Sequence, residues 1–568
     1  MAYKTHIRIL DNDSLLQIFD HYRLKHENAW NLRLMWRNLA HVCRKWRFVI
    51  FDSWFHLDLR LHLTTTGIPR SVDALSHLPP LPLVIDYSTR TTGTISGRDK
   101  DNILFGLQQH GRVCRIALEA PSSSLRIWLE PMNSLYPRLE YLSLSSTTIE
   151  GTNPMLPETF QAPDLRHLAL HGIGLPKGLP LLSSTIILSS LSLTDIRASC
   201  YFPPMHLVTQ LQGFLHLEEL SIGFAIPLPL PSNEGDPLPF PIRPVTLPSL
   251  RKLTFRGVDI YFDNLVAQID APLLEQLTLA LFFDMTLTLV NLTEFVSRIE
   301  GFECPSARID FYGVGVCINA GHHKQRRLEK LNLRVSCERL DWQFDSAAQV
   351  CSALKNVMST VEDLTLDFHT HRMPSDWENT RDDMLWNELL LPFLGVKKLR
   401  IANDFLTLDF SQALESATGG LVLELLPELQ ELDARLKTGR VMKVFSVFAE
   451  TRRSLGRPIH VTGLPQAALH TEPEASHTGP ETSQLEPEVS HAEPEVSHTE
   501  PEVPHTEPEV SHTEPEVPHT KPEVPVPCLG PEVSHAEPHA QYFVFFYLSV
   551  LFVFCINLYS IYINVLGV

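Results

Sequence analysis

A short leucine pattern recurs along most of this chain and constrains its fold more than any other feature. Its core is L-x-x-L-x-L or a close variant, as in LEYLSL (139–144), LRKLTF (250–255) and LEKLNL (328–333). The central apolar residues of its twelve copies lie at positions 116, 142, 168, 191, 220, 253, 277, 309, 331, 364, 399 and 432. Their mean spacing is about 29 residues, a period that is typical of a solenoid.

Each copy is too small to bury its own leucines, so neighbouring copies must stack. We expect alternate leucines to point inward from a short strand, with the intervening residues facing outward on a parallel sheet. The core resembles leucine-rich repeats, although Ile173, Ile196 and Val258 occupy the position where that family often has asparagine. We therefore predict an α/β fold, an irregular leucine-rich-repeat-like solenoid over 113–464. An ordinary α/β domain with coincidental strands is the alternative, and twelve matches disfavour it.

Three further segments of this region have predicted roles. Residues 291–302 and 346–358 are expected to form helices on the outer side of the sheet. The proline-rich stretch 227–248 is expected to be a surface loop between two units. Residues 56–112 read as a connector that holds one strand over Leu81–Ile85.

Two amphipathic helices are predicted before the repeats. In the first, Leu15, Ile18, Phe19 and Tyr22 share one face. Asp13 or Ser14 can cap this helix, and Ser14 with Gln17 fits a capping box. The second stripe consists of Leu32, Trp36, Leu39, Cys43, Trp46 and Ile50. About forty residues bury too little to form a robust domain alone, so another surface should cover part of this apolar face.

This stretch resembles an F-box, and more closely the F-box proteins of mushroom-forming fungi. The matching residues are Leu10, Leu15, Leu16, Ile18 and Phe19, then Val42-Cys43-Arg44-Lys45-Trp46-Arg47, Leu57-Asp58-Leu59 and PPLPLVIDY (79–87). Asp11 stands where the family usually has proline, and we expect it to loosen the adaptor contact. The other interpretation is that these helices merely cap the following domain.

The resemblance implies a non-catalytic substrate-recognition subunit of a cullin-type ubiquitin ligase. The F-box (7–55) would bind a Skp-family adaptor, and thereby a cullin, while the repeat domain would bind an unidentified target protein. By resemblance, the adaptor-binding residues would be Leu10, Leu15, Leu16, Ile18, Phe19, Val42, Cys43 and Trp46, with Trp46 also forming the internal core. Outward-facing Arg256, Tyr312, Arg334 and Arg400 are predicted to contact the target, because Tyr and Arg dominate interface hot spots.

The composition changes twice after the repeats. Eight heptads of the type HTEPEVS run from His470 to Pro525, and the proline in each unit prevents a continuous helix. High charge with few hydrophobic residues predicts a disordered tail over 465–541.

Residues 542–568 contain no charged residue, and as a helix they would be long enough to cross a membrane. A membrane anchor and a spurious end of the chain both remain open. With an anchor, the chain would be a tethered repeat scaffold that binds partners without any ligase role.

Charge and cysteine usage exclude several other classes. The net charge is −19, and residues 470–541 hold sixteen glutamates and one lysine, so the rest of the chain is close to neutral. Nucleic-acid binding would need a basic face and is not expected. Nine cysteines without a C-x-x-C pair indicate free thiols in the cytoplasm or nucleus.

The sequence lacks the catalytic and nucleotide-binding motifs G-x-S-x-G, H-E-x-x-H and the phosphate loop. Its isolated histidines, His322, His323, His369 and His371, have no acid or cysteine at ligand spacing. We expect no catalysis, metal or cofactor.

Overall fold

The computed structural model divides the chain into two units, residues 1–469 and 470–568. It describes residues 10–24, 39–54, 56–57, 59–63, 81–89, 96–148, 153–176, 180–226, 244–282, 286–322, 329–337, 339–369, 384–416, 425–434 and 439–462. The predicted tail (465–541) and the uncharged segment (542–568) lie outside these residues. None of the described helices combines the length and the apolar character that a membrane crossing requires.

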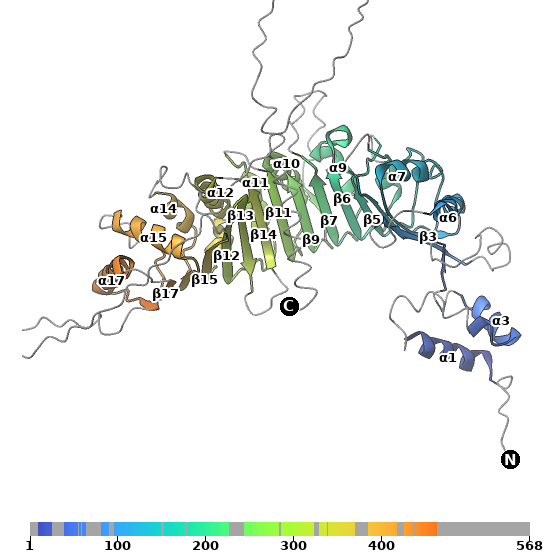
Figure 1. Ribbon diagram of the computed structural model, residues 1–568, viewed down its shortest axis with the longest axis horizontal. Coiled ribbons are helices and arrows are strands. Elements are labelled where there is room, and N and C mark those ends of the chain that lie inside the picture. Colours follow the sequence, from blue (N-terminus) through green and yellow to red (C-terminus); the bar gives the residue numbers. More distant parts are fainter. Residues whose placement is uncertain are drawn as a thin grey trace, which may run out of the picture. The chain divides into compact units, whose positions relative to one another are not determined.

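The first unit is a mixed α/β structure built on one sheet of sixteen strands, which stand side by side in Figure 1. In spatial order the strands are β1 (Leu61–His62), β2 (Leu83–Ser88), β3 (Val113–Ala120), β4 (Tyr141–Ser146), β5 (His167–His171), β6 (Ser190–Ile196), β7 (Glu219–Phe224), β9 (Lys252–Gly257), β11 (Gln276–Phe282), β14 (Glu329–Ser336), β13 (Gly315–Gly321), β12 (Ser306–Tyr312), β15 (Asp363–Phe368), β16 (Lys398–Ile401), β17 (Glu431–Ala434) and β18 (His460–Thr462). All neighbouring strands pair in parallel except β13, which is antiparallel to both β12 and β14.

The leucine cores form twelve of these sixteen strands. All twelve central residues lie in strands and are buried, which confirms the predicted inward face. Eleven of them occupy one row across the sheet, from Ile116 through Leu277 and Leu331 to Leu432. Ile309 lies in the next inward row, because Ala307 pairs with Leu364 in its place. Alternation therefore predicted the inward face of every leucine-core strand, although the position of Ile309 in the register differs from the prediction by two residues.

At one place, the order of the strands in the sheet differs from their order along the chain. Strand β11 pairs with β14 and not with β12, the next strand along the chain. Strand β13 then fills the space between β14 and β12. The predicted wholly parallel sheet is wrong here, because β13 had been missed: its sequence, GVCINAG, has no leucine core.

Gly315, at the start of β13, tests this arrangement. A methyl group there would overlap the carbonyl oxygen of Val335 on β14. Gly315→Ala should therefore lower the free energy of unfolding by roughly 1–3 kcal/mol in urea titrations. Gly97→Ala is the control, since nothing lies within 4 Å of the added carbon. Equal stability of the two variants would contradict the position of β13.

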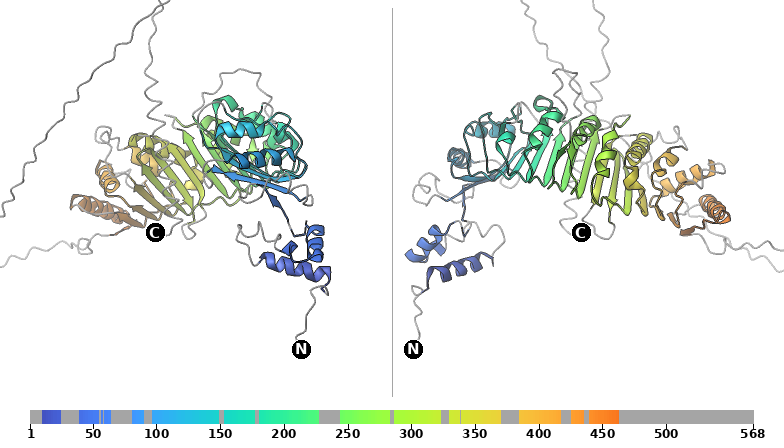
Figure 2. Two further views of the ribbon diagram at one scale, coloured as in Figure 1. Left: turned by 45° about the vertical axis from the view of Figure 1, so that its right-hand side comes forward. Right: turned by 180° about the vertical axis from the view of Figure 1, so that it is seen from behind.

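Helices cover one face of the sheet and leave the other open, as both views in Figure 2 show. Those that follow strands are α6 (Gly97–Gln108), α7 (Ser122–Leu129), α8 (Pro180–Ser184), α9 (Pro204–Leu211), α10 (Asp259–Val266), α11 (Val290–Ser297), α12 (Leu340–Ala353), α13 (Lys355–Met358), α14 (Met384–Leu390), α15 (Asp404–Ser416), α17 (Gly439–Ser454) and the short 3-10 helix η2 (Ala198–Cys200). Helices α11, α12 and α13 confirm the two predicted segments, although α12 begins six residues early. Strands β8 (Val245–Thr246) and β10 (Ile269–Asp270) form a separate pair.

The sheet also begins earlier than the expected boundary at residue 113. Strand β2 corresponds to the strand predicted over Leu81–Ile85, and it pairs with both β1 and β3. Helix α6 lies in the segment read as a connector with one strand; it packs on β2, and its Ile103 and Leu107 are buried. Gly106 lets it approach closely, because an added carbon there would meet Leu63 and Ile85.

Candidate functional site

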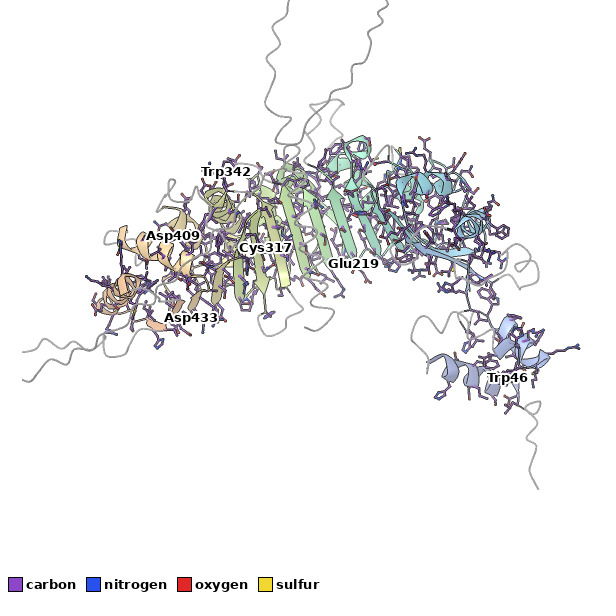
Figure 3. All side chains as sticks on the ribbon, in the orientation of Figure 1. Trp46, Glu219, Cys317, Trp342, Asp409 and Asp433 are labelled. Atoms are coloured by element: carbon purple, nitrogen blue, oxygen red, sulfur yellow. The ribbon has the colours of Figure 1, made fainter. Side chains whose placement is uncertain are left out.

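A pair of helices precedes the sheet: α1 (Asn12–Leu24) and α3 (Arg44–Asp52). Leu15, Phe19, Val49 and Ile50 are buried, and the Phe19 and Trp46 rings meet edge to face with centroids 5.0 Å apart. Figure 3 labels Trp46 in this pair. Leu15 and Phe19, two residues of the predicted apolar face of the first helix, are thus buried in the packing of the pair.

Both helix starts differ from the prediction. Asp11 caps α1, because its Oδ1 accepts a hydrogen bond from the Ser14 amide at 2.7 Å. This hydrogen bond lowers the pKa of Asp11. Cys43 does not lie inside a helix: it caps α3, and its sulfur accepts from the Trp46 amide. Residues 31–38, which carry Leu32 and Trp36, lie outside the described residues.

The predicted adaptor-binding residues separate into buried and exposed groups. Leu15 and Phe19 are buried, with Phe19 only 2% exposed, so Phe19 does not offer the surface contact expected of it. Leu10, Leu16, Cys43 and Trp46 are half-buried. Ile18 is 43% exposed and Val42 50% exposed. These two side chains are the most exposed members of the set.

Phe48 adds a third exposed apolar residue that sequence reasoning missed. It is 64% exposed, and Arg44, Arg47, Phe51 and Asp52 line a shallow hollow with it. The signal was present in the sequence, because Phe48 lies off the stripe that contains Trp46 and Ile50. An aromatic residue off the buried stripe of an amphipathic helix faces solvent or a partner.

The open face of the sheet is the second candidate surface. Its middle row consists mostly of small or polar residues: Ala117, Ser143, Ala169, Ser192, Ser221, Thr254, Thr278 and Asn332. Larger side chains stand in the rows beside it. The four predicted target-binding residues, Arg256, Tyr312, Arg334 and Arg400, all occupy outward positions on this face.

Arg256 and Arg334 lie in one row, separated by Ala280 on the strand between them. Burial lowers the pKa of Arg256, and the charge of Arg334 lowers it further, against the opposing effect of Asp195. Burial and the Asp310 charge raise the pKa of Tyr312 to about 12, while Arg334 acts in the opposite direction. Three of the four predicted residues therefore influence one another electrostatically.

An ion-pair network lies next to this group. Arg308 Nε is 2.7 Å from Asp310 Oδ1, and a terminal nitrogen of Arg308 is 2.8 Å from Asp367 Oδ2. His369 Nε2 is 2.9 Å from Asp310 Oδ1, and its ring stacks on Tyr312. The prediction that His369 has no nearby acid is wrong, because residues about sixty positions apart meet on adjacent strands.

Asp310, Asp367 and His369 place three ligand atoms within 4.8 Å of one another, a spacing that could suit a metal ion. The guanidinium group of Arg308 already bridges both carboxylates from this side. A cation would have to displace that positive charge. We therefore assign these groups to an ion-pair network.

Arg400 differs from the other predicted contacts. Its Nε is 2.8 Å from Asp433 Oδ2 on β17, so its charge is compensated within the sheet. Asp433, labelled in Figure 3, marks its position toward the end of the sheet. The structure brings Arg256, Arg334 and Tyr312 together and leaves Arg400 in a separate pair.

No family model matches this chain, and a comparison with curated proteins finds no match.

Proposed function

We propose that this chain is the substrate-recognition subunit of an SCF-type (Skp–cullin–F-box) ubiquitin ligase and performs no bond chemistry itself. The observation that carries the proposal is the exposure of Ile18, Val42 and Phe48 on a small helical pair. So much apolar surface on two short helices favours a partner that covers it. The resemblance of residues 7–55 to an F-box supports a Skp-family adaptor as that partner.

In this proposal the sheet is a leucine-rich-repeat-like solenoid that holds the target on its open face. The in-register rows of buried leucines support that assignment, because each strand buries its leucines against the next. The protein would act by proximity: it raises the effective concentration of target lysines near the ubiquitin-charged enzyme.

The adaptor contact is tested by a charge placed on the exposed helical surface. Ile18→Asp and Phe48→Asp should each reduce recovery of a purified Skp-family adaptor by the full-length chain at least about tenfold. A carboxylate that loses water at an apolar interface without a partner is strongly unfavourable. Recovery is measured by pull-down at several adaptor concentrations.

Ile186→Asp is the matched control, since Ile186 is 71% exposed but lies between α8 and β6, outside the helical pair. Phe19→Asp is unsuitable, because Phe19 is buried and its loss would disrupt the helical pair. Recovery of adaptor by all variants alike, or by none including the wild type, would remove the ligase role.

The second candidate is a membrane-tethered repeat scaffold without a ligase role. The uncharged stretch 542–568 is the observation that favours it. This candidate uses the same open face for its partners but needs no adaptor. A soluble reporter fused to 542–568 that partitions into membranes, together with a failed adaptor pull-down, would favour it.

A further inference from the structure

Two arginines on the open face, Arg256 and Arg334, stand apart from the others in having no carboxylate partner in the part of the chain that the structure describes. Arg115, Arg308 and Arg400 each form an ion pair with an aspartate on the same or a neighbouring strand. Among the described residues, no carboxylate lies within ion-pair distance of Arg256 or Arg334. Asp195 acts on Arg256 only as a longer-range charge.

The two arginines face each other across a short side chain. Arg256 on β9 and Arg334 on β14 both pair with Ala280 on β11, so their Cα atoms lie about 10 Å apart. Only a methyl group stands between them. On the other side of Arg256, its register partner on β7 is Gly223, which has no side chain. The Arg256 guanidinium carbon lies 5.7 Å from the centre of the Phe282 ring, two residues beyond Ala280 on β11, and the charge of Arg334 acts on it there.

Further hydrogen-bond donors lie on the same face of the sheet. Thr254 and Thr278 lie two residues earlier on the same strands and on the same face. Tyr312 keeps its hydroxyl proton at neutral pH, since its pKa is raised to about 12. Donors from hydroxyl groups and two guanidinium groups are the set that a phosphate or carboxylate accepts from.

The surrounding charges limit the ligand to a single anionic group. Asp195 lies near Arg256, and Asp310 and Asp367 continue the row beyond Arg334, where Arg308 already pairs with both of them. A polyanion such as a nucleic acid needs a continuous basic face, whereas the residues beside the two arginines in their row are Gly223 and Cys317. One oxyanion placed between the arginines would instead relieve the repulsion between them.

We propose that Arg256 and Arg334 form an oxyanion-binding site on the open face, which holds a phosphate or carboxylate group carried by a segment of the recruited protein. The proposal rests on the proposed function only in taking the recruited protein as the source of that group. The remaining contacts of the open face would then determine which of the proteins that carry such a group are bound.

The test uses the full-length chain and three fluorescent peptide libraries with degenerate flanks. Their fixed central residue is phosphoserine, glutamate or alanine, and binding is followed by anisotropy. The first two libraries should bind and the third should not, and the stronger of the two identifies the source of the charge. Arg334→Gln should weaken binding roughly tenfold to a hundredfold, as expected for hydrogen bonds to a charged group. Arg251→Ala, which removes an exposed arginine paired with Glu275, should have no effect.

A second variant separates ligand binding from a structural role of the arginines. Ala280→Glu places a carboxylate between them, so it should abolish peptide binding while the melting temperature is unchanged or raised. Loss of binding only together with a lower melting temperature would point to a structural role and overturn the proposal. So would equal binding of all three libraries, no binding of any, or binding only after removal of residues 470–568, whose glutamates would then be the ligand.

Adaptor recovery by the same variants distinguishes this inference from the proposed function. Arg334→Gln and Ala280→Glu should recover the Skp-family adaptor as the wild type does. Oxyanion binding by a chain that recovers no adaptor would remove the ligase role and keep the site. Adaptor recovery without oxyanion binding would keep the ligase role and remove the oxyanion site.

Discussion

Replacing Leu331 by alanine is expected to lower the free energy of unfolding by about 2–5 kcal/mol. Leu331 is fully buried in β14, between Leu277 of β11 and Ala320 of β13 in the register. Removal of its side chain leaves a cavity on the inward face that neighbouring strands cannot close without breaking their pairing. Leu277→Ala should have an effect of the same size, since Leu277 is equally buried in the same row.

Equilibrium unfolding in urea, followed by circular dichroism, measures this loss. Thr278→Ala is the matched control, because Thr278 is the next residue along β11 and faces the open side. Its effect should stay within about 0.5 kcal/mol, as for most surface substitutions. If Leu277→Ala were as stable as Thr278→Ala, the assignment of Leu277 to the inward face and Thr278 to the outward face would be wrong.

Asp263→Ala should destabilise the protein by about 2–4 kcal/mol, since it removes a helix cap and leaves buried amides unsatisfied. The Asp263 carboxylate is buried in α10 and accepts hydrogen bonds from the Asn291 amide and side chain at 2.8 and 2.7 Å. It also accepts one from the Leu292 amide. Helix α11 depends on this carboxylate, because Leu289 at its N-cap has no acceptor of its own.

Thermal unfolding of Asp263→Ala, Asp263→Asn and Glu294→Ala would measure the effect. Asn keeps one acceptor oxygen and should lose less stability than Ala. Glu294 is an exposed acid in α11 that pairs with Arg298, and its removal should change little. A melting temperature of Asp263→Ala equal to that of Glu294→Ala would show that the cap contributes nothing.

Several features of the surfaces could be read from local patterns. Alternation within L-x-x-L-x-L placed Arg256, Arg334 and Arg400 outward, because side chains on a strand alternate between its two faces. Helical spacing likewise placed Leu15 and Phe19 on one apolar face. What that face contacts was not readable: Phe19 packs on Trp46 within the pair, and Ile18 and Phe48 remain exposed.

Contacts between distant residues had no local signal. Arg308, Asp310, Asp367 and His369 meet because β12 pairs with β15, and the spacing of about sixty residues hides that pairing. The same holds for Asp263 and Asn291, which belong to consecutive helices. The position of a carboxylate in the sequence does not predict which cation or amide it contacts in the folded protein.

The sequence by itself determined the inward face of every leucine-core strand, since burial of alternate leucines is a property of the strand and its nearest neighbours. Only the tertiary structure decided the order of strands between β11 and β15. There the chain places β14 beside β11, and β13, which lacks leucines, completes the sheet between β14 and β12. Pairing partners depend on which edges remain free when the chain folds back, and no residue of GVCINAG specifies that edge.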